Sequence, residues 1–330
     1  MGMEMYSENE NIINVEHLNK VFYSVRGFWK REKHPVQAVK DISFCIRKGE
    51  LFGMVGPNGA GKTTTVKMLA TLLLPTGGKA TVFGHDVVKD TDKIRPRIGF
   101  TFGGNKGLYS RLSALDNLKY FAELYKLDSE TIETRVREML EAVGLTGREK
   151  DRVETYSSGM QQRLHLARAM LHDPDLIFLD EPTVGIDPIG SREIRALVKE
   201  LVGRGKTILL TTHYMYEAEE LCDRIAVVNH GEIVALDTPA SLKMRASGDS
   251  VIVVHTPTEN PALESELSNL QSEINHLSNS HEMVSIHTQN PGLILNALAA
   301  LLEQQVISNI EVRNATLEDV YVQIIKESAS

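Results

Sequence analysis

The sequence lacks the long apolar runs of a membrane protein. No segment approaches the roughly 18 to 20 uninterrupted apolar residues of a membrane-spanning helix, and the N-terminus lacks the basic-then-apolar order of a signal peptide. We therefore expect a soluble, cytosolic protein. Cysteine is also scarce, because Cys45 and Cys222 are the only two and form no metal-ligand or CxxC spacing. We interpret both as buried free thiols.

Positive charge is in deficit, and the deficit is unevenly distributed. The 330 residues include 36 Lys and Arg against 44 Asp and Glu, a net charge of −8. Residues 240–330 hold 4 basic against 11 acidic side chains, whereas the first 239 hold 32 against 33. This asymmetry and the length favour two domains with different surfaces. An acidic surface gains nothing from releasing phosphate counterions, so we expect no nucleic-acid partner.

The hydrophobic pattern predicts an α/β fold. An apolar run at 51–56 indicates a buried strand, and 62–74 indicates a helix that ends at Pro75. Further strands are predicted at 176–179, 207–211, 224–229 and 232–236, and helices at 114–125, 131–143, 160–171 and 191–203. Alternating strands and helices favour a mainly parallel sheet covered on both faces. The segment from about 107 to 172 has no predicted strand, so we interpret it as an inserted helical subdomain.

A domain boundary is predicted near Thr238-Pro239, giving domains at 1–238 and 239–330. The second is expected to be a small α+β domain. It regulates or stabilises a dimer, binds a partner, or only stabilises the fold. Its predicted strands are 250–255, 283–287 and 307–313, and its predicted helices are 262–277, 292–304 and 317–326.

The segment between the first strand and its helix matches the phosphate-loop pattern G-x-x-x-x-G-K-[ST]. It consists of Gly56, Pro57, Asn58, Gly59, Ala60, Gly61, Lys62, Thr63 and Thr64. Glycines let backbone N–H groups turn toward phosphate oxygens, and the helix N-terminus adds partial positive charge. Lys62 is then expected to reach the β and γ phosphates, and Thr63 to bind Mg²⁺. The motif predicts a P-loop NTPase fold that binds nucleotide phosphates and Mg²⁺.

Two carboxylates follow the predicted strand at 176–179. Asp180 and Glu181 are therefore expected where that strand emerges beside the phosphate loop. We predict that Asp180 holds Mg²⁺, directly or through water, and that Glu181 is the general base for an attacking water. Taken alone, such a pair also suits a strand that leads into a surface turn.

Together with these motifs, the chain resembles the nucleotide-binding subunits of ABC (ATP-binding cassette) transporters over residues 11 to 238. Tyr156-Ser157-Ser158-Gly159-Met160 resembles the family's LSGGQ signature, Gly185-Ile186-Asp187-Pro188 its D-loop, and Thr211-Thr212-His213 its switch histidine. The resemblance implies that Ser157, Ser158, Gly159 and Met160 contact the ATP of the opposite subunit. It further implies that His213 is catalytic and that Asp187 couples the two sites. The aromatic residue that stacks on adenine is expected to be Phe22, with Tyr23 as the second candidate. Outside the family, the Ser-Ser-Gly segment is simply a helix N-cap.

The chain departs from the family pattern at several positions. Tyr156, Ser158 and Met160 replace the leucine, first glycine and glutamine of LSGGQ. Gly103 or Gly104 stands where the family's Q-loop has its glutamine. We expect Asn105 to supply a similar amide to Mg²⁺ and the attacking water. The basic segment around Trp29 fits either a membrane-contacting loop or a solvated hairpin.

The resemblance also predicts partners. A dimer of nucleotide-binding subunits is expected, either a homodimer or a heterodimer with a related chain. A separate integral-membrane permease is expected to contact residues 107–125. Segments 215–224 and 315–321 resemble ATPases of prokaryotic ABC-2-type exporters, which favours export at the cytoplasmic face of the cell membrane. The alternatives are a soluble ABC-type ATPase that acts on ribosomes or DNA, or a general P-loop kinase or GTPase.

Overall fold

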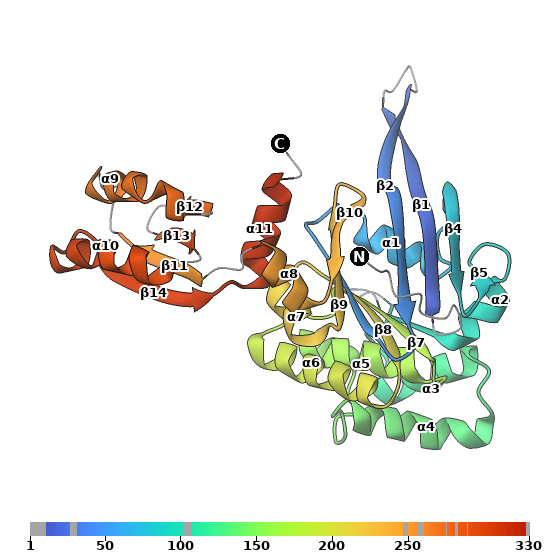
Figure 1. The fold of residues 1–330 in the computed structure, drawn as a ribbon. Helices are drawn as coiled ribbons and strands as arrows, with labels where there is room; N and C mark the ends of the chain where they lie inside the picture. The colour runs from blue at the N-terminus through green and yellow to red at the C-terminus, as the bar shows by residue number, and fades with distance from the viewer. Residues whose placement is uncertain are drawn as a thin grey trace. The chain divides into compact units, whose positions relative to one another are not determined.

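The chain folds into two units in a computed structural model. The structure describes residues 11–26, 32–101, 107–246, 250–256, 261–274, 276–280, 283–288 and 290–327. The division between the units falls between Leu236 and Asp237, giving units Met1–Leu236 and Asp237–Ser330. Figure 1 shows the elements of each unit.

Five parallel strands form one half of the large sheet in the first unit. They are β3 (Leu51–Val55), β6 (Ile98–Thr101), β7 (Leu176–Asp180), β8 (Thr207–Thr212) and β9 (Arg224–Asn229), in the order β9-β3-β8-β7-β6. Every residue of β3, β7 and β8 is buried, as expected for strands covered on both faces. Their carboxyl ends share one edge, because β3 pairs in parallel with β8 and β8 with β7.

The other half of this sheet is mainly antiparallel, and of its strands only the one at 232–236 was predicted from the sequence. It contains β1 (Asn11–Arg26), β2 (Glu32–Arg47), β4 (Gly77–Val82) and β5 (His85–Asp86), and β10 (Glu232–Asp237) joins β2 to the parallel half. The ten strands follow the order β5-β4-β1-β2-β10-β9-β3-β8-β7-β6. Strands β1 and β2 pair with several register shifts, which bend the pair.

Helix α1 (Lys62–Leu69) is enclosed between the two halves of the sheet, and it contacts β2 and β4 on one side and β7 and β8 on the other (Figure 1). Val66 and Leu69 of α1 belong to one core cluster with Phe178 of β7. The helix is shorter than the predicted span of 62–74. It ends early because Thr71 adopts a left-handed backbone conformation, with φ of 60°. A single turn, α2 (Thr91–Ile94), and a 3-10 turn at Arg95–Arg97 precede β6.

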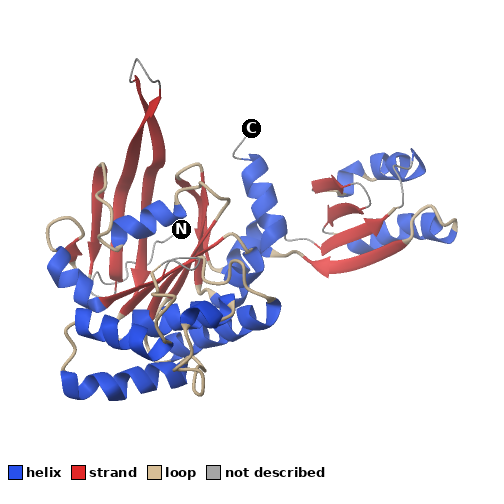
Figure 2. Cartoon of the chain, turned by 180° about the vertical axis from the view of Figure 1, so that it is seen from behind, coloured by secondary structure: helices blue, strands red, loops and turns tan. Residues whose placement is uncertain are grey.

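Three helices form the segment predicted as a helical subdomain. They are α3 (Ala114–Leu124), α4 (Ser129–Ala142) and α5 (Ser158–Met170), with a 3-10 turn at Val153–Thr155, and they contact one another. The described residues of 107–172 contain no strand beyond an isolated bridge between Ser113 and Arg152. Helices α6 (Pro188–Gly203) and α7 (Met215–Leu221) complete the unit. In Figure 2 these helices gather on one side of the strands.

The second unit contains a four-stranded antiparallel sheet. Its strands are β11 (Ser250–His255), β12 (His276–Ser280), β13 (Met283–Thr288) and β14 (Asn309–Asn314), in the order β12-β13-β11-β14. Helices α9 (Pro261–Asn269) and α10 (Pro291–Glu303) share a hydrophobic cluster with β11 and β13. Helices α8 (Pro239–Ala246) and α11 (Leu317–Glu327) contact each other. No helix in the described ranges is both long and apolar enough to span a bilayer.

The prediction of a helix at 262–277 was wrong in its second half. Helix α9 ends at Asn269 and is followed by a 3-10 turn at Gln271–Glu273, and the chain then enters β12. Leu277 lies opposite Ile286 in the β12–β13 pair, so the apolar residue read as helical belongs to a hairpin. Strand pairing, which is not visible in a short window of sequence, decided the conformation.

Candidate nucleotide-binding site

The phosphate loop connects β3 to α1, and its glycines adopt conformations that other residues resist. Gly56, Gly59 and Gly61 have φ values of 155°, 84° and 106°. A Cβ atom at Gly56 would lie 2.1 Å from the backbone oxygen of Val228, and one at Gly61 would lie 2.5 Å from that of Ala38. Because the neighbouring backbone lies so close, there is no room for a side chain at either position, and only glycine fits.

The loop surrounds a cavity of about 210 Å³ in front of the α1 N-terminus. Its lining consists of Ala38, Asn58, Gly59, Ala60, Gly61, Lys62, Thr63, Thr64 and Glu181. Backbone N–H groups at a helix N-terminus and one lysine make this a cavity suited to phosphate. Of the predicted loop residues, Gly56 and Pro57 do not line the cavity, but their carbonyl oxygens accept hydrogen bonds from Lys62, at 2.7 and 3.1 Å.

Lys62 is the charged centre of this cavity. Its side chain is 4% exposed, and its Nζ lies 3.7 Å from Oε1 of Glu181. Burial lowers the pKa of Lys62, and the nearby carboxylates of Glu181 and Asp180 partly offset that effect. An additional negative group in the cavity, such as a phosphate, would compensate the cost of burying this ammonium.

Asp180 lies at the end of β7, beside the first turn of α1. Its Oδ1 accepts hydrogen bonds from Thr63, at 2.9 Å, and from Thr211 of β8, at 2.5 Å. Hydroxyl and carboxylate oxygens are the ligands that Mg²⁺ prefers, and it commonly takes only one or two from protein. The described residues contain no group of three His, Cys, Asp or Glu side chains able to hold a metal. The oxygens of Thr63 and Asp180 fit one or two positions around a Mg²⁺ ion, whose other positions phosphate oxygens and water would fill.

Glu181 lies between the lysine and the switch histidine. Its Oε2 is 3.3 Å from Nδ1 of His213, close enough for an ion pair with a protonated ring, although the two groups are not aligned as a hydrogen bond. Both side chains remain partly accessible, at 21% for Glu181 and 29% for His213. The backbone of Glu181 has a φ of 50°, a conformation that a non-glycine residue adopts at a cost of about 1–3 kcal/mol. Its N–H donates to the Thr211 backbone oxygen, at 2.9 Å, which helps to hold this geometry.

Phe22 lies on the strand pair that borders the phosphate loop. It is 41% exposed and pairs with Val36, which is two residues before Ala38 in β2. The Lys20 ammonium lies 5.2 Å from the centre of the Phe22 ring. Phe22 does not line the cavity, but it presents an exposed aromatic face on a neighbouring strand. A role in stacking on adenine remains a prediction.

The residues predicted as the signature lie at the start of α5, and two of them are exposed. Ser157 is the N-cap, and its Oγ accepts a hydrogen bond of 3.2 Å from the Met160 N–H. Ser157 and Ser158 are exposed, whereas Gly159 is buried. The cap fits the simple structural interpretation, and the exposed hydroxyls leave donors free to meet a phosphate brought by another subunit.

Asp187 is the N-cap of α6, and the first turn of α6 lies close to the first turn of α5 at Gly190 and Gly159. Its Oδ1 accepts hydrogen bonds from the N–H groups of Ile189 and Gly190, both at 3.0 Å. These bonds, the one from Gly190 above all, lower the pKa of Asp187. A Cβ on Gly159 would lie 3.7 Å from Cα of Gly190. The start of α5 and the start of α6 are therefore in close contact.

Some sequence predictions cannot be placed, and some lining residues were not predicted. Gly103, Gly104 and Asn105 lie outside the described residues, as does Trp29. Ala38 was missed because only the pairing of distant strands brings β2 to the phosphate loop. Thr211 was noted only as part of the switch segment, although it bonds Asp180 directly.

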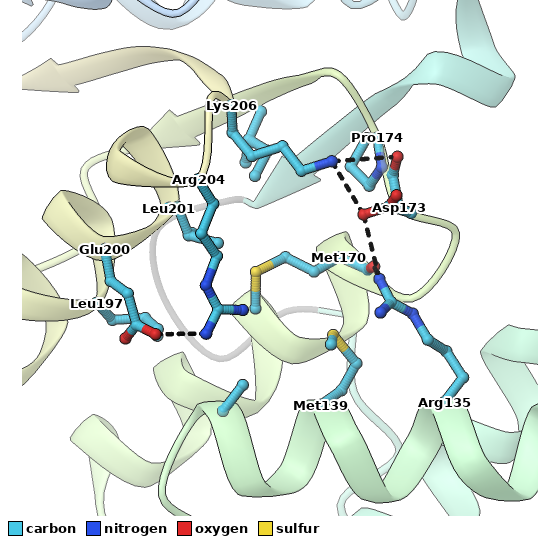
Figure 3. Close-up of a pocket in the computed structure, with 12 residues that line it drawn as sticks. Arg135, Met139, Met170, Asp173, Pro174, Leu197, Glu200, Leu201, Arg204 and Lys206 are labelled. Carbon is cyan, nitrogen blue, oxygen red and sulfur yellow. Dashed lines mark hydrogen bonds and ion pairs between the residues drawn. The ribbon is translucent and has the colours of Figure 1, made fainter.

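A second, smaller cavity of about 70 Å³ lies between α4, α5, α6 and β7, away from the phosphate loop (Figure 3). Its apolar wall includes Met139 and Met170. Each cation at its rim already has a carboxylate partner: Arg135 and Lys206 share Asp173, and Arg204 pairs with Glu200. Because the basic side chains at its rim are paired with carboxylates of the same chain, this cavity gives no sign of an anion site.

Comparisons with known proteins agree with this arrangement. Residues 39–184 match the family model described as "ABC transporter". The chain is 44% identical over 214 residues to the linearmycin resistance ATP-binding protein LnrL of Bacillus subtilis, covering 65% of this chain and 68% of that protein. It is 38% identical over 285 residues to the daunorubicin/doxorubicin resistance ATP-binding protein DrrA of Streptomyces peucetius, covering 85% and 84%. A match of that length exceeds the first unit, so it extends into the second.

Solved structures also resemble the first unit. The dimeric post-hydrolysis state of the ATP-binding cassette MJ0796, bound to ADP and Pi, superposes with a TM-score of 0.60 at 27% identity. The match covers 68% of this chain and 98% of that one. The nucleotide in that structure is a property of that protein, and the similarity supports the same fold here.

Proposed function

Because the chain belongs to the ABC transporter family, we propose that it is the ATP-binding and ATP-hydrolysing subunit of an exporter whose membrane channel is a separate polypeptide. One observation carries the proposal: Lys62, Asp180, Glu181 and His213 lie together at the phosphate loop although they come from three segments, the start of α1, the end of β7 and the end of β8. An isolated glycine-rich turn would not need two carboxylates and a histidine at its rim.

The side chains divide the chemistry among them. Lys62 and the backbone N–H groups of the loop bind and neutralise the β and γ phosphates. Glu181 accepts a proton from the attacking water as general base, and His213 orients Glu181 and the γ-phosphate. Thr63 and Asp180 would hold Mg²⁺, which supplies charge neutralisation to the phosphates when bound. Phe22 would bind adenine, and Asn105 would supply an amide to the Mg²⁺ ion and the water.

We propose that two such subunits enclose two ATP molecules. The exposed Ser157 and Ser158 of one subunit would meet the γ-phosphate held by the other, with Gly159 and Met160 completing the signature. Apolar side chains flank Asp187, since Val184 is 37% and Ile189 is 75% exposed. Such residues suit burial against a second copy or a related chain. ATP then stabilises the closed dimer, and hydrolysis favours its opening.

The partner is proposed to be an ABC-2-type permease at the cytoplasmic face of a prokaryotic membrane. Relatives named for resistance to linearmycin and daunorubicin favour export. The transported substrate is proposed to be selected by the permease rather than by this chain. Exposed aromatic residues on the helical subdomain, including Tyr109 and Tyr120, offer a surface for permease helices. The second unit is proposed to regulate or stabilise the dimer.

Copurification tests this proposal against the soluble alternative. The full chain, tagged and expressed with its neighbouring genes, is extracted in mild detergent and its partners are identified. Recovery of a polytopic membrane protein, together with ATPase activity that the partner modifies, supports the exporter subunit. Recovery of ribosomes or DNA without a membrane protein supports the alternative ATPase. Absence of ATP hydrolysis by the complex would contradict the proposed activity.

A further inference from the structure

Two side chains from the C-terminal end of α5 and the residues just after it bond to the backbone on either side of residues 102–106. Nη1 of Arg168 donates to the backbone oxygen of Gly107 at 2.6 Å. Nε2 of His172 lies 2.9 Å from the backbone oxygen of Ile98, the first residue of β6. Because a carbonyl oxygen can only accept, the neutral His172 ring carries its hydrogen on Nε2. The end of α5 is therefore joined to the chain both before and after this segment.

The same two side chains stack on aromatic rings of α3. Cζ of Arg168 lies 4.9 Å from the centre of the Phe121 ring. The His172 ring stacks on Tyr125, with 4.1 Å between the ring centres and 27° between the ring planes. In each pair of residues the members are four apart in sequence, so the two contacts follow one another at the spacing of a helical turn. Helix α3, the end of α5 and the backbone around β6 therefore meet at two adjacent contacts.

The chain that these contacts hold leads to the nucleotide site. Strand β6 pairs in parallel with β7, and Thr101 lies opposite Leu179, the residue before Asp180. The carboxyl end of β6 is therefore on the edge of the sheet where Asp180 meets the phosphate loop. The positions predicted as the Q-loop lie in sequence between Thr101 and Gly107. The opposite end of α5 begins after Ser157, the first of the signature residues predicted to contact phosphate.

Packing alone does not require a cation at position 168. The Arg168 side chain is buried, at 8% exposed, and burial lowers the pKa of its guanidinium. Among the described residues, its charge is met by the Gly107 oxygen and the face of the Phe121 ring rather than by a carboxylate. A methionine would fill much of the same space without the cost of burying a charge, but it could not bond to Gly107. The fit is close, because a Cβ at Gly107 would lie 2.7 Å from Nη1.

We propose, on the basis of the function proposed above, that Arg168 and His172 are positioning residues that couple the nucleotide site to α3. They do so by holding the backbone oxygens of Gly107 and Ile98, so that the chain at the nucleotide-binding edge and α3 change position together. Such coupling is reciprocal: a permease helix bound to α3 affects the nucleotide site, and bound nucleotide affects α3. Neither residue lines the phosphate-loop cavity, so both act through the backbone that they hold.

Hydrogen exchange of the full chain, with and without Mg²⁺ and the non-hydrolysable ATP analogue AMP-PNP, tests this coupling. In the parent chain, we expect the analogue to slow the exchange of amides in α3, although α3 does not line the cavity. In Arg168→Met this nucleotide-induced change should fall to less than about a third of the parent value. The affinity for AMP-PNP should stay within about threefold of the parent, because the phosphate loop is unchanged.

Arg135→Met is the matched control, because Arg135 also joins a helix of the same subdomain to backbone oxygens. Its Nε and Nη2 donate to Leu171 and Met170, at 2.9 and 2.8 Å, on the opposite side from the chain around β6 in these bonds. We expect Arg135→Met to change the exchange of α4 without nucleotide and to retain the nucleotide-induced change in α3. A merely structural role of Arg168 would make the two variants behave alike.

A second variant keeps the test decisive should Arg168→Met fail to fold. His172→Phe keeps an aromatic ring against Tyr125 and removes the donor to Ile98, and it should also reduce the response of α3. A full response in the variant that folds, or no response of α3 in a parent chain that binds AMP-PNP and hydrolyses ATP, overturns the proposal. A parent chain that binds no nucleotide contradicts the proposed function instead.

Discussion

Thr63, in the first turn of α1, donates a hydrogen bond of 2.9 Å to Asp180, at the end of β7. The two residues are far apart in sequence and meet because parallel strands place their carboxyl ends on one edge of the sheet. Thr211, from the strand between β3 and β7, donates to the same carboxylate oxygen. One helix and two strands thus meet at this carboxylate, which is the geometry expected of a site for Mg²⁺ bound to phosphate.

Replacing this carboxylate should separate nucleotide binding from hydrolysis. We expect Asp180→Asn to lower Mg²⁺-dependent ATP hydrolysis by about 100-fold or more, because an amide binds Mg²⁺ far more weakly than a carboxylate. Binding of a fluorescent ADP analogue in EDTA should persist, since the phosphate loop is unchanged. Asp175→Asn, just before the same strand at its opposite end, is the matched control and should retain activity. Equal hydrolysis by the two variants would contradict the assignment.

Glu181 lines the phosphate-loop cavity, and we expect it to act on the attacking water. Glu181→Gln preserves the shape and the hydrogen-bonding length of the side chain but cannot accept a proton as a general base. We expect hydrolysis to fall by about 100-fold or more, and the ATP-bound dimer to persist. Light scattering after size-exclusion chromatography with ATP, and again with ADP, measures both effects. Hydrolysis above about a tenth of the parent rate would show that another group is the base.

The phosphate loop should not tolerate a methyl group at Gly61. Its φ is 106°, and a Cβ would lie 2.5 Å from the backbone oxygen of Ala38, so the loop and β2 cannot both keep their positions. We expect Gly61→Ala to weaken nucleotide binding by at least about tenfold and to lower the free energy of unfolding by about 1–3 kcal/mol.

Gly203 provides the matched control for that substitution. No heavy atom lies within 4 Å of a Cβ built at Gly203, and its φ is not in the left-handed region. Gly203→Ala is therefore expected to leave nucleotide binding unchanged and stability within about 1 kcal/mol, measured by calorimetry and by urea unfolding. If both alanine variants behave alike, the close approach at Gly61 has no functional consequence.

Much of the site could be predicted because its signals are local. The phosphate-loop motif and the apolar run that ends in Asp180-Glu181 each lie within ten residues, and most of the parallel strands around them are short apolar runs. The contribution of Ala38 could not be predicted, since it depends on how β2 bends through register shifts against β1. The conformation of 270–280 depended likewise on pairing with β13. Sequence windows show propensity, whereas these features are decided by contacts between distant segments.

The second unit contains an ion pair that makes its stability depend on pH. Burial alone would raise the pKa of Asp319, but hydrogen bonds from Arg313 and Thr316 outweigh that effect and hold the pKa at about 2. The Arg313 guanidinium bonds both oxygens of Asp319, at 2.5 and 3.0 Å, and the Asp319 side chain is 15% exposed. A carboxyl whose pKa is lower in the folded state stabilises the fold above its unfolded pKa and loses that effect on acidification.

We therefore expect Arg313→Gln to destabilise the second unit by roughly 2 kcal/mol near neutral pH, and by much less near pH 2. The destabilisation should shrink as the pH falls from about 4 to about 2, the interval between the unfolded and folded pKa values. Hydrogen exchange of amides in β14 and α11, measured in urea at several pH values, reports this unit separately from the first. Arg97→Gln, which breaks an exposed pair with Asp175 in the first unit, should leave those amides unaffected. A loss of protection in Arg313→Gln that is equal at every pH would mean that packing, rather than the charge on Asp319, holds β14 to α11.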